Sequence, residues 1–218
     1  KDHRIRAVFD SNLKTKEHFA DSKFGAIVRE NGFDETKTWR EKEWHEKYYP
    51  IFPLQEFVAL ENTKKGIAVL NKDIPQYEII NENNTKIALT LVSGVSHMGK
   101  RDLINRPGRR SGIHIETPDA QMLGENISEY SIYPFNNDYI ESLGFQIVKN
   151  NSIPIKALTE EDTIKYFSTL GNEIESMKEF DSKLKLLNIK NGIINTSTIK
   201  KSEKEDSIVW RLYNPTHK

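Results

Sequence analysis

Short runs of β-forming residues, separated by turn residues at nearly regular intervals, fill the first two-thirds of this 218-residue chain. Such runs occur at 26–30 (AIVRE), 56–60 (EFVAL), 65–72 (KGIAVLNK), 76–82 (QYEIINE) and 85–95 (TKIALTLVSGV). The NENN stretch between the last two favours a hairpin, because asparagine tolerates the backbone angles of tight turns. No helical pattern alternates with these runs, which argues against a parallel βαβ sheet. The pattern predicts an all-β protein with the architecture of an antiparallel β-sandwich.

The last third of the chain has a different pattern. Apolar residues recur there three or four positions apart, at Ile164, Phe167, Leu170, Ile174 and Met177. This period predicts a short helix over 160–170, and Thr159 with Asp162 resembles a capping box at its start. Runs typical of strands return at 192–200 and 207–214. We therefore expect a main sandwich portion at 1–150, a charged and partly helical connection at 151–181 and closing strands at 182–218, with one or two short helices between 136 and 177.

Composition excludes several kinds of function. Lys and Arg together number 32, as do Asp and Glu, so the formal net charge is zero and a dedicated nucleic-acid-binding protein is not expected. The absence of cysteine excludes disulfide scaffolds, thiolate zinc sites and thiol catalysis. The six histidines form no HxH, HxxH or HExxH pair, and the chain has no P-loop and no GxSxG motif. We therefore expect no metal site and no catalytic residue in this chain.

The sequence has no segment typical of membrane insertion or export. No stretch approaches the roughly 18 apolar residues that span a bilayer. The first residues, KDHRIRAVFDSN, carry charges but lack an apolar region of about 7–15 residues, so they do not form a signal peptide. They are typical of a strand already in progress. We interpret the chain as a piece of a longer cytoplasmic protein without a membrane partner.

Three arginines, Arg106, Arg109 and Arg110, stand in a turn between two apolar stretches. Pro107 fixes one backbone angle and Gly108 permits angles closed to other residues, so the shape of the turn is specified. Guanidinium groups hydrogen-bond to phosphates, carboxylates or vicinal hydroxyls. The balanced charge weakens the phosphate alternative, which leaves a polar ligand such as a sugar, or a contact with another domain.

The segment 102–110, called the arginine turn below, therefore supplies the candidate substrate-proximal residues Asp102, Arg106, Arg109 and Arg110. We expect at least one of the arginines to reach a sugar site or its immediate surroundings. The alternative is that the arginines pair with carboxylates such as Asp102 or Glu116 and only brace the turn.

A second candidate is the aromatic segment at 37–50, KTWREKEWHEKYYP. Its aromatic residues are Trp39, Trp44, Tyr48 and Tyr49, and rings of this kind stack on the C–H faces of sugars. The alternative is that they cover the core or contact another domain. The carboxylates of this segment, Glu41, Glu43 and Glu46, are interpreted as a solvated charge run.

Several motifs follow one another in a fixed order along the chain. They are DHRIRAVFD at 2–10, PLQEFVAL at 53–60, KGIAVLNKDIPQYEI at 65–79, ALTLV at 88–92, RPG at 106–108, TPDAQ at 117–121, GENISEY at 124–130 and STIKKSEKEDSIVWRLYNP at 197–215. This ordered set resembles the C-terminal region of glycoside hydrolase family 38, the α-mannosidases, in particular the bacterial branch that includes mannosylglycerate hydrolases. Ser93 stands where the family pattern T-L-L-R has arginine, so no role of that arginine is carried over.

The resemblance implies a supersandwich-like C-terminal β-domain of a bacterial enzyme of mannose metabolism. In this family a carboxylate nucleophile, assisted by zinc, and a second acid/base carboxylate hydrolyse α-mannosides with retention. The zinc ligands and the nucleophile belong to an N-terminal catalytic domain, followed by a helical bundle, and no part of this sequence matches either. The resemblance also replaces the helical interpretation beyond about residue 178 by a strand, a turn and a strand.

The chain by itself is therefore expected to be inactive and to bind no cofactor. In the parent protein we expect it to complete the mannoside cleft, to pack against the catalytic and helical domains and to help form a homodimer. Two alternatives stay open, a stand-alone carbohydrate-binding β-sandwich that uses the aromatic segment and a protein-interaction domain without a ligand. Glycan binding by the isolated chain would distinguish the first alternative from an enzyme fragment.

Overall fold

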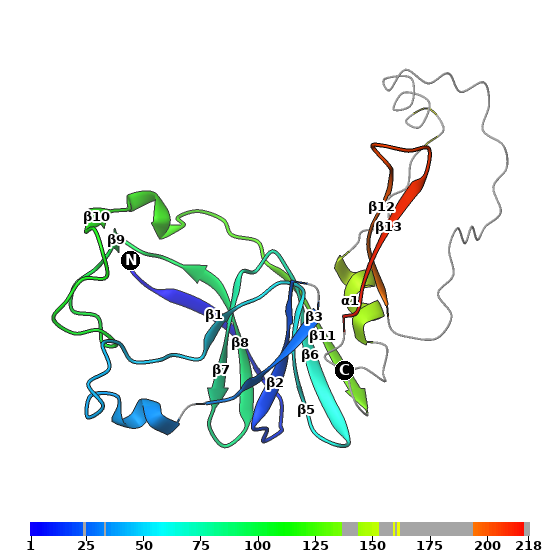
Figure 1. Cartoon of the computed structure of the whole chain (residues 1–218). Coiled ribbons are helices and arrows are strands. Elements are labelled where there is room, and N and C mark those ends of the chain that lie inside the picture. The colour runs from blue at the N-terminus through cyan, green and yellow to red at the C-terminus, as the bar shows by residue number, and fades with distance from the viewer. Residues whose placement is uncertain are drawn as a thin grey trace. The chain divides into compact units, whose positions relative to one another are not determined.

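Two antiparallel β-sheets face each other in the larger part of this computed structural model (Figure 1). The first has the order β1-β8-β7-β4, formed by β1 (Arg4–Asp10), β8 (Thr85–Ser93), β7 (Gln76–Asn81) and β4 (Ile51–Pro53). The second has the order β11-β6-β5-β2-β3, formed by β11 (Glu129–Asn136), β6 (Lys65–Lys72), β5 (Phe57–Glu61), β2 (Glu17–Ser22) and β3 (Gly25–Glu30).

Shorter elements complete the structure. They are the strands β9 (His97–Met98) and β10 (Ile115–Glu116), the 3₁₀ helices η1 (Asp34–Thr38) and η2 (Pro118–Gln121), the helix α1 (Gly144–Ser152), and the hairpin strands β12 (Asn195–Lys201) and β13 (Ile208–Tyr213). The structure describes residues 1–23, 25–32, 34–136, 144–152, 159, 161 and 194–215. The described residues up to 152, together with 214 and 215, form one compact unit, and those between 153 and 213 form a second.

The core between the two sheets follows from the alternation of side chains along each strand. In β7, Tyr77 and Ile79 are 0% and 1% exposed, whereas Glu78 between them lies on the opposite face and forms ion pairs with Arg4 and Arg6 of β1. The buried residues of this core are Leu13, Ala20, Leu54, Val58, Leu60, Val69, Ile74, Tyr77, Ile79, Ile87 and Leu89. Both sheets contribute to the list, so this cluster stabilises the sandwich.

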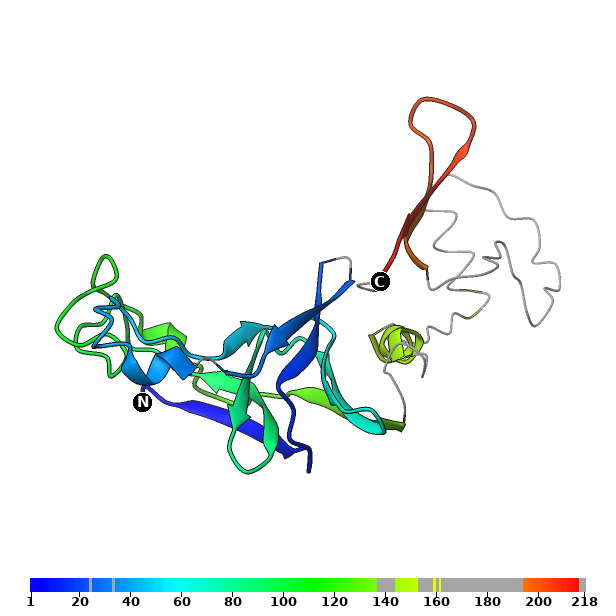
Figure 2. The same ribbon diagram turned by 60° about the horizontal axis from the view of Figure 1, so that its bottom comes forward.

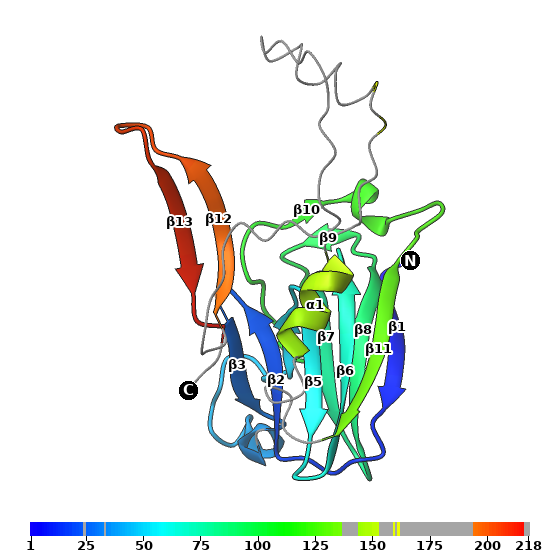
Figure 3. The same ribbon diagram turned by 90° about the vertical axis from the view of Figure 1, so that its right-hand side faces the viewer.

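The five-stranded sheet is buried on its second face as well. Phe57 and Ala59 of β5 point to that face, where Phe145 and Val148 of α1 pack against them. Figure 3 shows α1 lying in front of β5 and β6. Burial on both faces explains why four consecutive residues of β5, Phe57–Leu60, are buried although a strand with one wet face would alternate.

The expectation of an antiparallel all-β fold with short helices is confirmed, and α1 lies between residues 136 and 177 as expected. In the second unit, β12 and β13 pair antiparallel, and the indole of Trp210 donates a hydrogen bond to Thr196 Oγ1 at 3.1 Å. The expected helix over 160–170 lies outside the described residues, apart from residue 161. The same is true of most of the expected connection at 151–181.

Gly66 in β6 leaves space for an aromatic ring from the neighbouring strand. Phe135 of β11 pairs with Gly66, and a Cβ at Gly66 would overlap the Phe135 ring. We expect Gly66→Ala to lower the free energy of unfolding by about 2 kcal/mol, because the ring must move in a packed cluster. Urea unfolding measures this. Gly32→Ala is the control, since its Cβ would lie 3.8 Å from Asn81 Nδ2 in ordinary contact; equal effects would contradict the prediction.

Candidate functional site

The arginine turn is closed by its own backbone and by Asp102. The Arg106 N–H donates to the Leu103 carbonyl at 2.9 Å, and the Gly108 N–H donates to Asp102 Oδ1 at 2.8 Å. Gly108 has φ +78°, which glycine adopts without strain. Asp102 therefore holds the shape of the turn by accepting a hydrogen bond from its backbone.

Arg106 is the buried residue of the turn, with 6% of its surface exposed. Its guanidinium donates to Glu46 Oε1 at 2.8 Å and to the Lys100 carbonyl at 3.1 Å. Arg109 reaches the same Glu46 oxygen at 3.6 Å. The hydrogen bond from Arg106 holds the pKa of Glu46 below its ordinary value. Glu46, expected in a solvated charge run, is 43% exposed and is also the partner of two arginines.

The arginine turn and the aromatic segment are neighbours in space although about sixty residues separate them in sequence. The Lys47 N–H donates to the Asn105 carbonyl at 2.9 Å, and Arg109 donates to the His45 carbonyl at 3.4 Å. Figure 2 shows the loops that follow β8, in green, beside η1 and the segment after it, in blue. The fold thus brings the two sequence-predicted candidates to one end of the sandwich.

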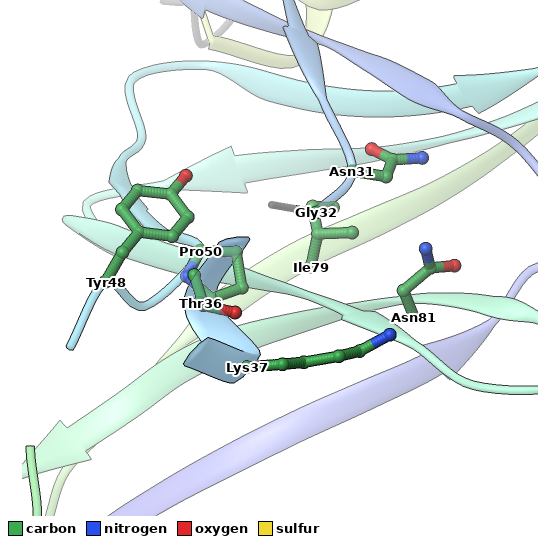
Figure 4. Close-up of a pocket in the computed structure, with 8 residues that line it drawn as sticks. All are labelled: Asn31, Gly32, Thr36, Lys37, Tyr48, Pro50, Ile79 and Asn81. Atoms are coloured by element: carbon green, nitrogen blue, oxygen red, sulfur yellow. The ribbon is translucent and has the colours of Figure 1, made fainter. Parts of the chain in front are cut away.

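The four aromatic residues of the segment have different surroundings. Trp39 and Trp44 are partly buried, with Arg40 above the Trp39 ring at 5.2 Å and Lys42 above the Trp44 ring at 5.8 Å. Tyr48 and Tyr49 are 37% and 38% exposed. Lys47 lies 5.5 Å from the centre of the Tyr49 ring, whereas Tyr48 lines a pocket (Figure 4).

This pocket has a volume of about 320 Å³ and is built by four separate parts of the first unit. Its lining residues are Asn31, Gly32, Thr36, Lys37, Tyr48, Pro50, Ile79 and Asn81. The end of β3, η1, the loop before β4 and the end of β7 contribute to it. Among the aromatic residues proposed to stack on a sugar, Tyr48 belongs to this lining.

Asn31 forms the wall of the pocket that faces the protein interior, and its orientation is determined by its hydrogen bonds. It is 2% exposed, and its amide nitrogen donates to the Thr15 carbonyl and hydroxyl and to the Glu17 carbonyl. The amide oxygen is therefore an acceptor, which His18 Nδ1 approaches at 2.7 Å. His18 must donate from Nδ1, so a neutral ring leaves Nε2 as an acceptor.

The hydrogen-bond chain continues from His18 to the edge of the protein. His18 Nε2 lies 2.8 Å from the Tyr77 hydroxyl, which donates to it, and the Tyr77 oxygen accepts a hydrogen bond from Arg29 at 3.0 Å. Burial lowers the pKa of His18 to about 4, and the charge of Arg29 acts in the same direction. Burial also raises the pKa of Tyr77. Both groups are therefore neutral at pH 7, as the hydrogen-bond directions require.

Asp2 ties the start of the chain to the loops that carry the arginine turn. Its carboxylate accepts hydrogen bonds from Ser96, from the backbone at 2.6 Å and from the hydroxyl at 2.7 Å, and from Lys100 and Gln121 at 3.0 and 3.2 Å. These bonds, with that of the Ser96 hydroxyl the largest, lower the pKa of Asp2. Sequence reasoning missed the role of Asp2. The signal was present, because Asp2 belongs to the first motif and its partner Gln121 belongs to the TPDAQ motif.

Within the described ranges no group of three or more His, Cys, Asp or Glu side chains could hold a metal ion. The rings of His97 and His114 stack at 4.8 Å, and Glu116 lies 3.7 Å from His97. None of the helices described here is long and apolar enough to cross a membrane.

Comparisons with known proteins relate this chain to one family. The family described as glycosyl hydrolases family 38 C-terminal domain matches residues 1–120. A relative from Halalkalibacterium halodurans, named as a mannosylglycerate hydrolase, is 29% identical over 144 residues, which are 65% of this chain and 13% of that protein. The chain thus spans a small part of this relative's length.

Two solved structures share the fold. An α-mannosidase from Enterococcus faecalis V583 matches 99% of this chain and 21% of its own with a TM-score of 0.72 and 23% identity. A glycosyl hydrolase family 38 protein from Enterococcus faecalis matches 100% of this chain and 21% of its own with a TM-score of 0.67 and 22% identity.

Proposed function

Because this chain belongs to family 38 of the glycosyl hydrolases, through the C-terminal domain family that matches residues 1–120, we propose that it serves as the C-terminal β-domain of an α-mannosidase-like enzyme. In this proposal the parent protein hydrolyses α-mannosides. Its catalytic carboxylates and its zinc ion belong to another domain. The present chain completes one side of the substrate cleft and packs against the catalytic and helical domains.

The observation that carries the proposal is the arrangement of the arginine turn. Arg106 is held by Glu46 and by a backbone carbonyl, so we propose that it positions the turn. Arg109 keeps 46% of its side chain exposed, and Arg110 is also exposed. The Arg109 guanidinium is already held by Glu46 and the His45 carbonyl, so it loses less rotamer freedom when it binds a hydroxyl or a carboxylate. Arg109 is therefore the residue that we propose to reach the sugar.

Exposed apolar side chains on the same loops support the proposed domain packing. Ile104, Ile113, Leu123 and Ile127 are exposed by 86%, 76%, 91% and 84%. Single exposed apolar residues are common, but several large ones within one group of loops are typical of a surface that another protein surface covers. We propose that the catalytic domain of the parent covers them.

Alanine variants in the full-length parent test the role of the turn. We expect Arg109→Ala to lower kcat/KM for an aryl α-mannoside roughly 30-fold, about 2 kcal/mol, because a charged hydrogen bond in the transition state is lost. Its melting temperature should hardly change. Arg106→Ala should lower the melting temperature, since it leaves Glu46 without its main partner.

Arg101→Ala is the matched control, because Arg101 is exposed on the same loop outside the turn. If the alanine variants of Arg106, Arg109 and Arg110 all keep near-normal kcat/KM, the turn is structural and the site assignment is wrong.

We further propose that the parent is a cytoplasmic bacterial enzyme of mannose metabolism that forms a homodimer. Size-exclusion chromatography of the parent tests the dimer, and cell fractionation tests the location.

A further inference from the structure

We infer that the pocket lined by Asn31, Lys37, Tyr48 and Asn81 is a separate site that binds one pyranose ring of a carbohydrate. The inference is independent of the catalytic role proposed for the parent and of the arginine turn. Its volume of about 320 Å³ falls in the range of small-molecule sites. Figure 4 shows the Tyr48 ring on one side of the pocket and the Asn81 amide on the other.

The lining matches the chemistry of a sugar ring, which has apolar C–H faces and a rim of hydroxyls. Tyr48 and Pro50 offer apolar surface to a C–H face. The Asn81 amide is a donor for the rim, and Thr36 and Lys37 add polar side chains to the lining.

The walls of the pocket are fixed by hydrogen bonds that do not depend on a ligand. The Asn31 side chain is held by Thr15, Glu17 and His18, as described above. On the opposite strand the Ile79 N–H donates to the Pro50 carbonyl at 3.1 Å. A site with such walls pays little ordering entropy on binding, which favours affinity for a small ligand.

Two positions permit a sharp test. Tyr48 and its neighbour Tyr49 are equally exposed, at 37% and 38%, but only Tyr48 is among the lining residues. Tyr49→Ala is therefore a matched control for Tyr48→Ala. Gly32 also lines the pocket, and a Cβ there would make only an ordinary contact at 3.8 Å. Gly32→Val should therefore fold and place its methyl groups in the space of the ligand.

The experiment is a titration of this chain with methyl α-mannoside, methyl α-glucoside and glycerol, followed by NMR chemical-shift changes. We expect saturable binding of a pyranoside with a Kd in the millimolar range, roughly 1–10 mM. Tyr48→Ala and Gly32→Val should weaken it about tenfold or more, and Tyr49→Ala less than about twofold. Glycerol should not bind, because it has no ring face for Tyr48.

Thermal unfolding of each variant separates loss of the site from loss of the fold. The inference is overturned if neither pyranoside binds the wild-type chain, if glycerol binds equally well, or if Tyr48→Ala and Tyr49→Ala weaken binding equally. If the pocket does not bind a pyranoside, the arginine-turn proposal is unaffected. That proposal is tested by the kcat/KM of variants of the parent enzyme and does not involve Tyr48.

Discussion

His18→Leu should lower the free energy of unfolding by about 4 kcal/mol at pH 7. The ring is fully buried, with hydrogen bonds to Asn31 and Tyr77. Leucine leaves the Asn31 oxygen and the Tyr77 hydroxyl without these partners, and each unsatisfied buried group costs about 1–3 kcal/mol. Urea unfolding of the purified chain measures the change. His114→Leu is the control, because His114 is exposed, and it should change stability by less than about 0.5 kcal/mol.

The pKa of His18 also predicts how stability depends on pH. The folded protein holds the ring neutral down to a pKa of about 4, whereas the unfolded chain protonates it below the ordinary value of 6.5. The unfolded state therefore binds more protons between these values, so the contribution of His18 is complete above pH 6.5 and is lost as the pH falls toward 4. The loss is on the order of 3 kcal/mol. His18→Leu should not show this loss of stability between pH 6.5 and pH 4. If its free energy of unfolding falls with pH as steeply as that of the wild type, the loss does not come from His18.

Asp21→Asn should raise the free energy of unfolding by about 3 kcal/mol at pH 8. Burial and, next, the neighbouring Glu56 carboxylate together raise the pKa of Asp21 to about 7, although Lys149 of α1 acts in the opposite direction. The side chain is 8% exposed, so its charge at pH 8 is costly. Asparagine has nearly the same shape and carries no charge.

The pH dependence of stability that Asp21 causes has the opposite sign to the one that His18 causes. The folded state keeps the proton up to about pH 7, whereas the unfolded state releases it near the ordinary value of 3.8, so stability decreases as the pH rises between these values. Asp21→Asn should therefore gain little at pH 4 and most at pH 8. Asp73→Asn is the control, since Asp73 is exposed at φ 62°, a conformation that asparagine also adopts. A gain that is equal at both pH values would refute the explanation.

Because the two effects oppose each other between pH 4 and 6.5, the pH profile of the wild-type chain by itself hides both. Only the differences between each variant and the wild type separate them. His18 and Asp21 stand three residues apart in β2, so their side chains point to opposite faces of the strand. His18 contacts Asn31 and Tyr77, whereas Asp21 lies beside Glu56, so they share no partner and should act independently.

The sequence by itself determined the class of fold and the family. Alternating side chains such as those of Tyr77 and Ile79, and turns rich in asparagine and glycine, are local features, because one strand buries every second residue whichever strand lies beside it. The ordered motifs also identified the family before any contact was known. The same reasoning placed the arginine turn and the aromatic segment on the list of candidates.

Only the tertiary structure decided which of these residues meet. Glu46 is 60 positions from Arg106, and His18 is 59 positions from Tyr77, so their pairing depends on the order of the strands and on loop positions that no local period encodes. For the same reason Glu46 resembled its solvated neighbours Glu41 and Glu43 in sequence. The pocket beside Tyr48 arises in the same way, because its walls come from four separate segments that become neighbours only when the two sheets pack together.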